Sequence, residues 1–261
     1  MSIWAKKKAW PDGVGRRVLA EVDSTNAQAM RVARELSGPT WILGLRQTAG
    51  RGRRGRPWSD PEGNFAATLV MQPAEPIEQV ALRSFVAALA LYDALEAAGV
   101  RADLALKWPN DVLLSDRKLA GILLESSGFG TGGTHLAIGI GVNLAHAPEA
   151  AEGAAFAPVS LREAAGLCLS PEGFLDLLAP AYAAREAQFI AHGFAPIRKD
   201  WLERAARLGE VITARTGTEE ITGRFETVDA AGHLVLSGRE KRHAIPAADV
   251  FFQGAADASG D

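Results

Sequence analysis

The chain has 261 residues, 48% of them hydrophobic and 23% charged, an ordinary globular composition that leaves room for one large domain, or one large and one small domain. Its formal net charge of −3 argues against a protein that binds nucleic acid over its whole surface. Its single cysteine, Cys168, excludes a disulfide framework and a cysteine metal cluster within the chain, and favours a reducing cytoplasm. At the N-terminus, the lysines at positions 6–8 are followed by Pro11 and Gly13 rather than by the apolar run of a signal peptide, and no stretch of about twenty apolar residues predicts a membrane span.

The first predicted elements are a short strand over residues 17–22 and a helix over residues 27–36. Ser24, Thr25 and Asn26 lie between them, after Asp23, and all four are residue types that cap helix N-termini. A cap alone would explain them. The free N–H groups and the positive dipole end of a helix also suit a carboxylate or a ureido oxygen, so a ligand site is the second interpretation.

An arginine- and glycine-rich loop, residues 50–58, follows a second predicted strand over residues 41–46 that ends at Gln47. Four of its nine residues are arginine and three are glycine. Glycine allows the backbone to approach a ligand closely, and arginine brings a charged planar fork that matches carboxylate or phosphate. We expect the free loop to be mobile and to close over a polyphosphate. An exposed basic turn and an RNA-binding patch are the alternatives.

Residues 65–71 predict a strand, and residues 77–98 predict one long helix whose apolar face makes it scaffold without a site of its own. A strand over residues 104–108 then runs into Lys107-Trp108-Pro109-Asn110-Asp111, where the proline favours a strand end or turn before a short strand over residues 112–114. Lys107 and Asp111 can face one pocket across that turn. An exposed Lys–Asp pair, which contributes little stability, is the alternative.

Two further predicted strands carry candidate site residues. The strand over residues 118–125 begins with a lysine, and alternation predicts that one face holds Lys118, Ala120, Ile122 and Leu124. A lysine at the rim of an apolar wall would suit a phosphate, and a solvated strand start is the alternative. The strand over residues 135–144 contains Gly139 and Gly141, which predict close backbone approach, and Asn143, which could contact a purine or a ribose.

The C-terminal part of the chain has a different pattern. Ser160 and Ser170 predict the starts of a short and a longer helix, and a third helix is predicted over residues 194–206. From Leu208 onward, five short strands separated by turns predict a small antiparallel barrel. We therefore expect one domain of residues 1–207, a second of residues 208–254, and a tail of residues 255–261.

In this order, the segments resemble the biotin protein ligase family (biotin–carboxyl-carrier-protein ligases). The resemblance covers nearly the whole chain and rests on residues 23–26, Gln47 with the loop 50–58, and residues 107–111, 118–125 and 139–144. It implies an α+β fold, in which a mixed-sheet catalytic domain like that of biotin and lipoate ligases precedes a small SH3-like C-terminal β-barrel. About twenty residues precede Asp23, so the chain resembles the monofunctional members that lack an N-terminal winged helix-turn-helix.

The resemblance implies a reaction in two steps. The biotin carboxylate attacks the α-phosphorus of Mg-ATP to give biotinyl-5′-adenylate and pyrophosphate, and a lysine of a biotin carboxyl carrier domain then attacks the adenylate. The expected cofactors are ATP and Mg²⁺, the latter held through the ATP phosphates rather than by protein ligands alone, and biotin is a substrate. The expected partner is the carrier domain of acetyl-CoA carboxylase or a related carboxylase. We expect no DNA or membrane partner, and dimers, which recur in the family, would form at an edge strand of the catalytic sheet.

The resemblance also implies roles for individual residues. The biotin-binding set is Ser24, Thr25, Asn26, Gln47, Gly50, Arg51, Gly52, Arg53, Lys118 and Gly121. The ATP-binding set is Arg51, Arg53, Arg54, Trp58, Lys107, Asn110, Lys118 and Asn143. Lys118 and Arg53 are the expected catalytic residues, because positive charge must meet the charge that develops on the phosphate. Asp111 is our candidate to accept the proton of the carrier lysine, since a reference pKa near ~10.4 makes its neutral form cost roughly 4.6 kcal/mol at pH 7.

Two other protein classes stay open at this point. A lipoate or octanoate ligase shares the catalytic fold, although the complete loop 50–58 and the Lys107–Asp111 run favour biotin. A nucleic-acid-binding regulator would use the arginine patch, but the negative net charge and the lack of a helix-turn-helix argue against it.

Overall fold

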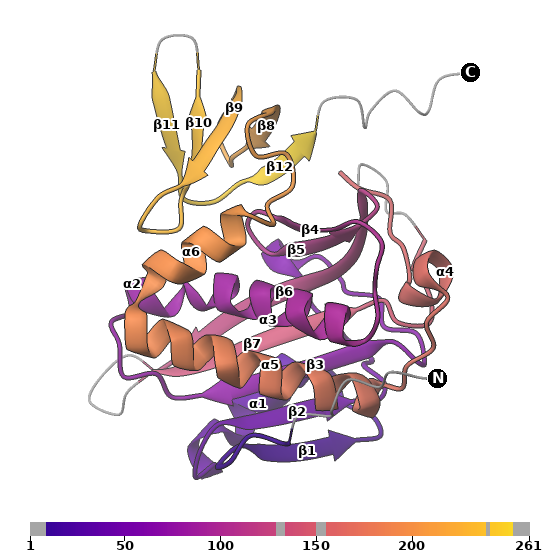
Figure 1. The fold of residues 1–261 in the computed structure, drawn as a ribbon. Helices are drawn as coiled ribbons and strands as arrows, with labels where there is room; N and C mark the ends of the chain where they lie inside the picture. The colour runs from indigo at the N-terminus through magenta and orange to yellow at the C-terminus, as the bar shows by residue number, and fades with distance from the viewer. Residues whose placement is uncertain (1–8, 129–133, 150–154, 239–240, 253–261) are drawn as a thin grey trace.

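The computed structural model describes residues 9–128, 134–149, 155–238 and 241–252 (Figure 1). The larger of its two sheets has seven strands, namely β1 (Gly15–Leu19), β2 (Thr40–Gly44), β3 (Phe65–Met71), β4 (Leu104–Lys107), β5 (Asp111–Leu114), β6 (Arg117–Ser127) and β7 (His135–Val142). Their order is β1-β2-β3-β7-β6-β5-β4, with β1 and β2 parallel and every other neighbouring pair antiparallel. The sheet is therefore mixed, as predicted.

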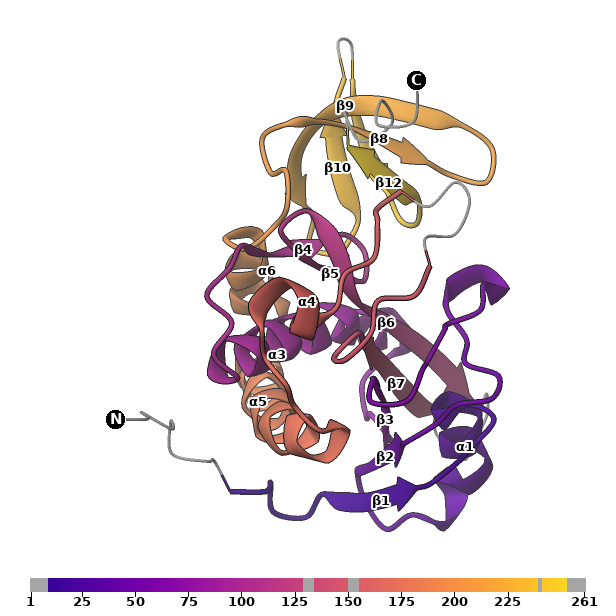
Figure 2. The ribbon, with the colours of Figure 1, turned by 90° about the vertical axis from the view of Figure 1, so that its right-hand side faces the viewer.

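Helices cover both faces of this sheet. They are α1 (Thr25–Val32), the 3₁₀ turns η1 (Ala33–Glu35) and η2 (Arg53–Gly55), α2 (Ile77–Val80), α3 (Arg83–Ala97), α4 (Leu161–Ala165), α5 (Pro171–His192) and α6 (Phe194–Leu202). α3 and α5 pack together on one face, and α1 lies on the other against β3 and β7 (Figure 2). Strand alternation explains the two layers: Trp41 and Leu43 of β2 join the core beneath α3 and α5, and Ile42 between them packs with Ala29 of α1.

The helix predicted over residues 77–98 is in fact two helices. α2 ends at Val80 and α3 begins at Arg83, and turns with i→i+3 hydrogen bonds join them. The prediction of one helix was wrong because apolar spacing alone does not register so short a break. At the start of α3, the buried Arg83 side chain pairs with Glu186 of α5 at 2.7 Å and with Glu75 at 3.1 Å. Similarly, the helix predicted over residues 194–206 ends at Leu202.

The second sheet consists of the five predicted C-terminal strands, β8 (Val211–Arg215), β9 (Glu220–Val228), β10 (Leu234–Ser237), β11 (Arg242–Ile245) and β12 (Asp249–Phe252). It is antiparallel, in the order β11-β10-β9-β8-β12. Trp108 Nε1, directly after β4 of the seven-stranded sheet, donates to Gly232 O of the second domain at 3.0 Å. The predicted tail, residues 255–261, lies outside the described residues. Within the described ranges, no helix has the length and apolar character needed to cross a membrane.

Candidate active site

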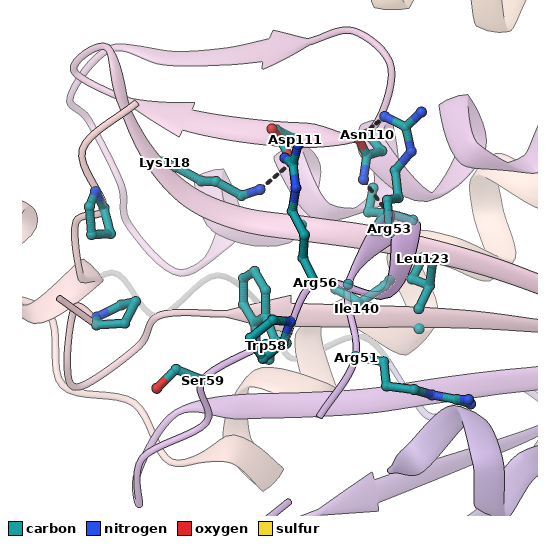
Figure 3. A pocket seen from close by; sticks show the side chains of 18 of the residues that line it. Arg51, Arg53, Arg56, Trp58, Ser59, Asn110, Asp111, Lys118, Leu123 and Ile140 are labelled. Carbon is teal, nitrogen blue, oxygen red and sulfur yellow. Dashed lines mark hydrogen bonds and ion pairs between the residues drawn. The ribbon is translucent and has the colours of Figure 1, made fainter. Parts of the chain in front are cut away.

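A cavity of about 600 Å³ opens on the face of the seven-stranded sheet that carries α1 (Figure 3). Its wall combines the start of α1, the loop 50–58, parts of β5, β6 and β7, and residues 248–251 of the second sheet. The motifs singled out in the sequence therefore contribute to one site. Of the candidate residues, only Gly50 and Arg54 do not line this cavity.

Three glycines form the floor of the cavity. Gly121 of β6 and Gly141 of β7 are directly paired, and Gly139 lies two residues earlier on β7. A Cβ atom at Gly141 would lie 2.4 Å from the Trp58 ring, and a Cβ atom at Gly139 would lie 2.2 Å from Asn26 Oδ1. The predicted close approach is confirmed, and the approaching groups are side chains of the protein itself. Glycine is needed here because these side chains lie directly on the strand backbone.

The start of α1 and Gln47 form one end of the cavity, in which the polar groups are uncharged. Ser24 caps α1 by accepting a hydrogen bond from a first-turn N–H at 3.5 Å, so the capping interpretation is confirmed. Gln47 Oε1 accepts from Thr25 N at 2.8 Å and from Thr25 Oγ1 at 3.1 Å. Thr68 Oγ1 of β3, fully buried, lies 2.8 Å from Thr25 Oγ1, within hydrogen-bonding distance. We call Thr25, Asn26, Gln47 and Thr68 the neutral end.

Asn26 uses its whole side-chain amide within the protein. Its Nδ2 donates to Glu125 Oε2 at 2.8 Å and to Leu123 O at 3.3 Å, and its Oδ1 accepts from Thr68 Oγ1 at 2.6 Å. Glu125 Oε2 also accepts from Arg51 Nη2 at 3.3 Å. Asn26 thus supports its neighbours at the cavity wall. Sequence analysis missed Thr68 and Glu125, although Thr68 is the one polar residue of β3 and a buried hydroxyl must find partners.

The opposite end of the cavity is charged. Asp111 Oδ1 lies 2.8 Å from Lys118 Nζ, and Asp111 Oδ2 lies 3.5 Å from Lys107 Nζ (Figure 3). Burial lowers the pKa of Lys107, with the Asp111 carboxylate opposing that shift. Burial disfavours ionisation of Asp111, but the charges of Lys118 and Lys107 outweigh it and lower the pKa of this carboxyl. With Arg53, these three residues form what we call the charged end.

Lys118 lies on a different face of β6 from the one predicted. The pairing of β5 with β6 shifts between Val112 and Leu113, so that Leu119 is an extra residue in β6. Lys118 consequently lies beside Gly121, with its Cε 3.6 Å from the position of a Cβ there, and not on the face of Ala120. The prediction of a shared face was wrong because a bulge interrupts strict alternation, and the bulge is what places this lysine in the site.

The loop 50–58 divides its arginines between the cavity and the second sheet. Arg53 lines the cavity and donates to Asn110 Oδ1 at 3.2 Å. Arg54, with a φ of 55°, and Arg56 each donate to Asp249 Oδ2 at 2.8 Å. Arg56 and Asp249 line the cavity, whereas Arg54 does not. Gly50 closes the base of the loop, where its carbonyl accepts from the backbone N–H of Trp58 at 2.9 Å.

Two asparagines hold backbone next to the charged end. Asn110 Nδ2 donates to Ile122 O at 2.7 Å, and Asn143 Nδ2 donates to Lys118 O at 3.4 Å and to Val159 O at 3.1 Å. Both line the cavity, but Asn143 is only 2% exposed. Its Oδ1 is buried without a hydrogen-bond partner in the described part of the chain, so this oxygen is the group that could receive a ligand donor.

Asp60 lies behind the loop, close to Gln47. Burial raises the pKa of its carboxyl to about 6, and the Gln47 amide groups oppose that shift only in part. Neither carboxylate oxygen accepts a hydrogen bond of good geometry from the described residues, although Gln47 lies near enough to lower the pKa. Asp60 is thus a poorly solvated acid next to the neutral end, and sequence analysis did not single it out.

The fold and the cavity define a member of a ligase superfamily, and comparison with known proteins identifies the branch. The family model of biotin/lipoate A/B protein ligases matches residues 18–143, and that of the biotin protein ligase C-terminal domain matches residues 208–253. A biotin–[acetyl-CoA-carboxylase] ligase of Paracoccus denitrificans is 58% identical over 240 residues, which cover 91% of this chain and 100% of the relative. This chain belongs to the biotin protein ligase family.

Two further relatives extend the comparison. The bifunctional ligase/repressor BirA of Bacillus subtilis is 32% identical over 214 residues, covering 81% of this chain and 65% of that protein. The biotin protein ligase from Aquifex aeolicus, solved in complex with biotin and ATP, superimposes with a TM-score of 0.76 at 26% identity, covering 90% of this chain and 97% of that one.

Proposed function

We propose that this protein is an ATP-dependent biotin protein ligase, which forms biotinyl-5′-adenylate and transfers the biotinyl group to a lysine of a biotin carboxyl carrier domain. The observation that carries this proposal is a single cavity with a neutral hydrogen-bonding end and a charged end. The first suits a head group with N–H and C=O groups, and the second suits a carboxylate meeting a phosphate. The similarity to a ligase solved with biotin and ATP supports the same assignment.

In this proposal biotin lies with its ureido ring against Gln47 and against Ser24 and Thr25 at the start of α1, where the positive end of the helix dipole favours an oxygen ligand. Trp58 and Leu123 supply apolar wall for the chain of the acid. The carboxylate then points toward Lys118. Asn26 contributes by holding the wall rather than by touching the ligand.

The first step joins the biotin carboxylate oxygen to the α-phosphorus and breaks the bond to pyrophosphate. Lys118 and Arg53 would stabilise the charge that develops on the phosphate, because both are fixed cations that line the cavity. Mg²⁺ bound to the phosphates would supply further positive charge there. Within the described residues, no group of three or more His, Cys, Asp or Glu residues could hold a metal ion, so we expect the phosphates to be its main ligands.

In the second step the amine of the carrier lysine attacks the acyl carbon, AMP leaves, and the amine loses a proton. Asp111 is our proposed acceptor, on one condition. Its pKa is lowered by Lys118 and Lys107, which makes it a weak base while both ion pairs persist. When Lys118 turns to the phosphate, one of these charges moves away and the carboxylate becomes more basic. If Asp111→Asn transfers preformed adenylate at the wild-type rate, this role is excluded.

ATP–pyrophosphate exchange tests the whole proposal. We expect exchange that depends on biotin and that neither lipoate nor octanoate supports. Exchange with lipoate or octanoate alone would move the protein to the other branch of the ligase superfamily. No exchange with any acid would contradict the activity itself.

The acceptor protein, the cellular location of the ligase and its oligomeric state are further parts of the proposal. Biotin protein ligases act on biotin carboxyl carrier proteins, and we propose the carrier of acetyl-CoA carboxylase as acceptor because the 58% identical relative bears that name. The exposed, unpaired Cys168 suits a reducing cytoplasm. Residues 204–206 bond to β4 and cover that sheet edge, which leaves β1 as the edge at which a homodimer would pair. We also propose a domain boundary near Leu208, and no DNA partner.

A further inference from the structure

A chain of hydrogen bonds connects Glu125, which does not line the cavity, to Thr25, which does. Glu125 lies on β6, two residues beyond Leu123. Its Oε2 atom accepts from Asn26 Nδ2 at 2.8 Å, and Asn26 Oδ1 accepts from Thr68 Oγ1 at 2.6 Å. Thr68 Oγ1 also lies 2.8 Å from Thr25 Oγ1. Four side chains from two strands and one helix are thereby connected in one line.

The carboxylate at one end gives this line a direction. An ionised carboxylate can only accept hydrogen bonds, so the Asn26 NH₂ group turns toward Glu125 and toward Leu123 O, 3.3 Å away. The Asn26 oxygen must then face Thr68. Thr68 has a single hydroxyl hydrogen, and the Asn26 oxygen 2.6 Å away has none and can only accept, so that contact needs the Thr68 hydrogen. We expect the hydrogen to be drawn toward Asn26.

At the cavity wall, this order decides what Thr25 can offer a ligand. With the Thr68 hydrogen on Asn26, the 2.8 Å contact between the two threonine oxygens needs the Thr25 hydrogen. That hydrogen is shared between Thr68 Oγ1 and Gln47 Oε1, 3.1 Å away, so Thr25 cannot donate into the cavity. Because Thr68 directs its hydrogen mainly to Asn26, lone pairs on Thr25 Oγ1 stay available for a donor. The cavity wall therefore presents Thr25 Oγ1 as a hydrogen-bond acceptor. This acceptor matches an N–H group of a cyclic urea, whereas an alkyl or dithiolane head group has no donor to pair with it.

We propose that Glu125 is a positioning residue that sets the specificity of this site for an acid whose head group carries an N–H donor. It acts through Asn26 and Thr68 on Thr25, without touching the ligand. This inference rests on the proposed function, because it concerns selection among acids by the same cavity. Glu125 also pairs with Arg51 of the loop at 3.3 Å, and a contribution through that arginine would affect all acids alike.

The test compares two acids on the full-length protein. Dissociation constants for biotin and octanoate are measured by calorimetry for the wild type, Glu125→Gln and Glu226→Gln. The last variant removes a carboxylate from an exposed ion pair with Arg242 in the second sheet and serves as the matched control. For Glu125→Gln we expect about tenfold weaker binding of biotin, because the hydrogen bond from Asn26 loses its charged acceptor. We expect octanoate binding to stay within about twofold of the wild type. The control should bind both acids as the wild type does.

A second variant makes the result independent of Glu125 itself. Thr68→Val keeps the shape of the side chain but removes the hydroxyl in the middle of the line, and should also weaken biotin alone. The double variant should lose no more than the more affected single variant, since both changes interrupt one line. Unchanged biotin binding, equal losses for the two acids, or additive losses in the double variant would overturn the inference. A wild type that fails to bind biotin would instead remove the proposed function.

Discussion

At the neutral end of the cavity, uncharged groups share hydrogens, whereas at the charged end, cations share one carboxylate. Thr25, Asn26 and Thr68 each have several partners between 2.6 and 3.3 Å. Asp111, by contrast, is shared by Lys118 at 2.8 Å and by Lys107 at 3.5 Å, while Arg53 donates to the neutral Asn110. At the neutral end, most hydrogen-bonding groups already have a partner within the protein. The charged end has more positive charge than its carboxylate can balance.

From this difference we infer that the neutral end selects the substrate and that the charged end promotes the chemical step. A satisfied neutral network is rigid and discriminates by hydrogen-bond pattern, because a ligand without the right donor leaves a buried group unpaired. A cluster with surplus positive charge attracts an anion and stabilises negative charge that develops during reaction. We therefore expect changes at the neutral end to affect the KM for biotin, and changes at the charged end to affect kcat.

The largest effect is expected from Lys118→Ala. Loss of one preorganised cation should lower kcat for biotin-dependent pyrophosphate exchange by about 10²–10³-fold, with a much smaller change in the KM for biotin. Asp111 keeps Lys107 as its partner, so the variant should stay folded. Lys199→Ala, which removes an exposed lysine of α6, is the control and should retain wild-type kinetics. A loss confined to KM would place Lys118 in ground-state binding and would break the comparison.

A smaller effect is expected from Gly139→Ala, which tests the neutral end by sterics. The added Cβ would lie 2.2 Å from Asn26 Oδ1, and β7 cannot move away easily because it is paired with β3 and β6. We expect a loss of about 1–3 kcal/mol in the free energy of unfolding and a higher KM for biotin, with kcat little changed. Gly217→Ala, where nothing lies within 4 Å of the added Cβ, is the matched control for urea unfolding. Wild-type KM in Gly139→Ala would mean that Asn26 does not shape the biotin site.

The sequence predicted the parts of the site that depend on local pattern. Ser24 caps α1, as its residue type predicts. Gly139 and Gly141 mark the places where side chains closely approach the backbone of β7. Residues within a few positions of one another determine these features, so one sequence is enough to read them. The same holds for most strands, because apolar alternation is visible without knowing which strand pairs with which.

Features that depend on pairing between distant segments could not be predicted in this way. The bulge that places Lys118 in the cavity is a property of β5 and β6 together. The line from Glu125 to Thr68 joins residues 99 and 42 positions apart through Asn26. Arg54 carries the same charge as Arg53 but is held by Asp249, 195 positions away. In each case the position of a side chain is decided by a partner that no local pattern identifies.

The smallest effect is expected from Asp60→Asn, which addresses a carboxylate close to Gln47 of the neutral end. Its pKa in the folded protein is about 6, above the ordinary value of 3.8, so the unfolded chain ionises first. Stability should therefore fall as pH rises from about 4 to about 6, and the penalty should persist above that range. Removing the charge should raise the free energy of unfolding at pH 7.5 by about 1 kcal/mol, less than the full shift would give because the side chain is partly solvated, and the gain should disappear below pH 4.

Urea unfolding of the wild type, Asp60→Asn and Asp12→Asn between pH 4 and 7.5 measures this difference. Asp12→Asn removes the same charge from an exposed turn and should follow the wild type throughout. If Asp60→Asn is instead less stable at pH 7.5, the ionised carboxylate must be held by a donor, and Gln47 is the group close enough to supply it. The neutral end would then depend on a second ionised carboxylate besides Glu125. It would differ from the Lys107–Asp111–Lys118 cluster only in how many cations surround each carboxylate.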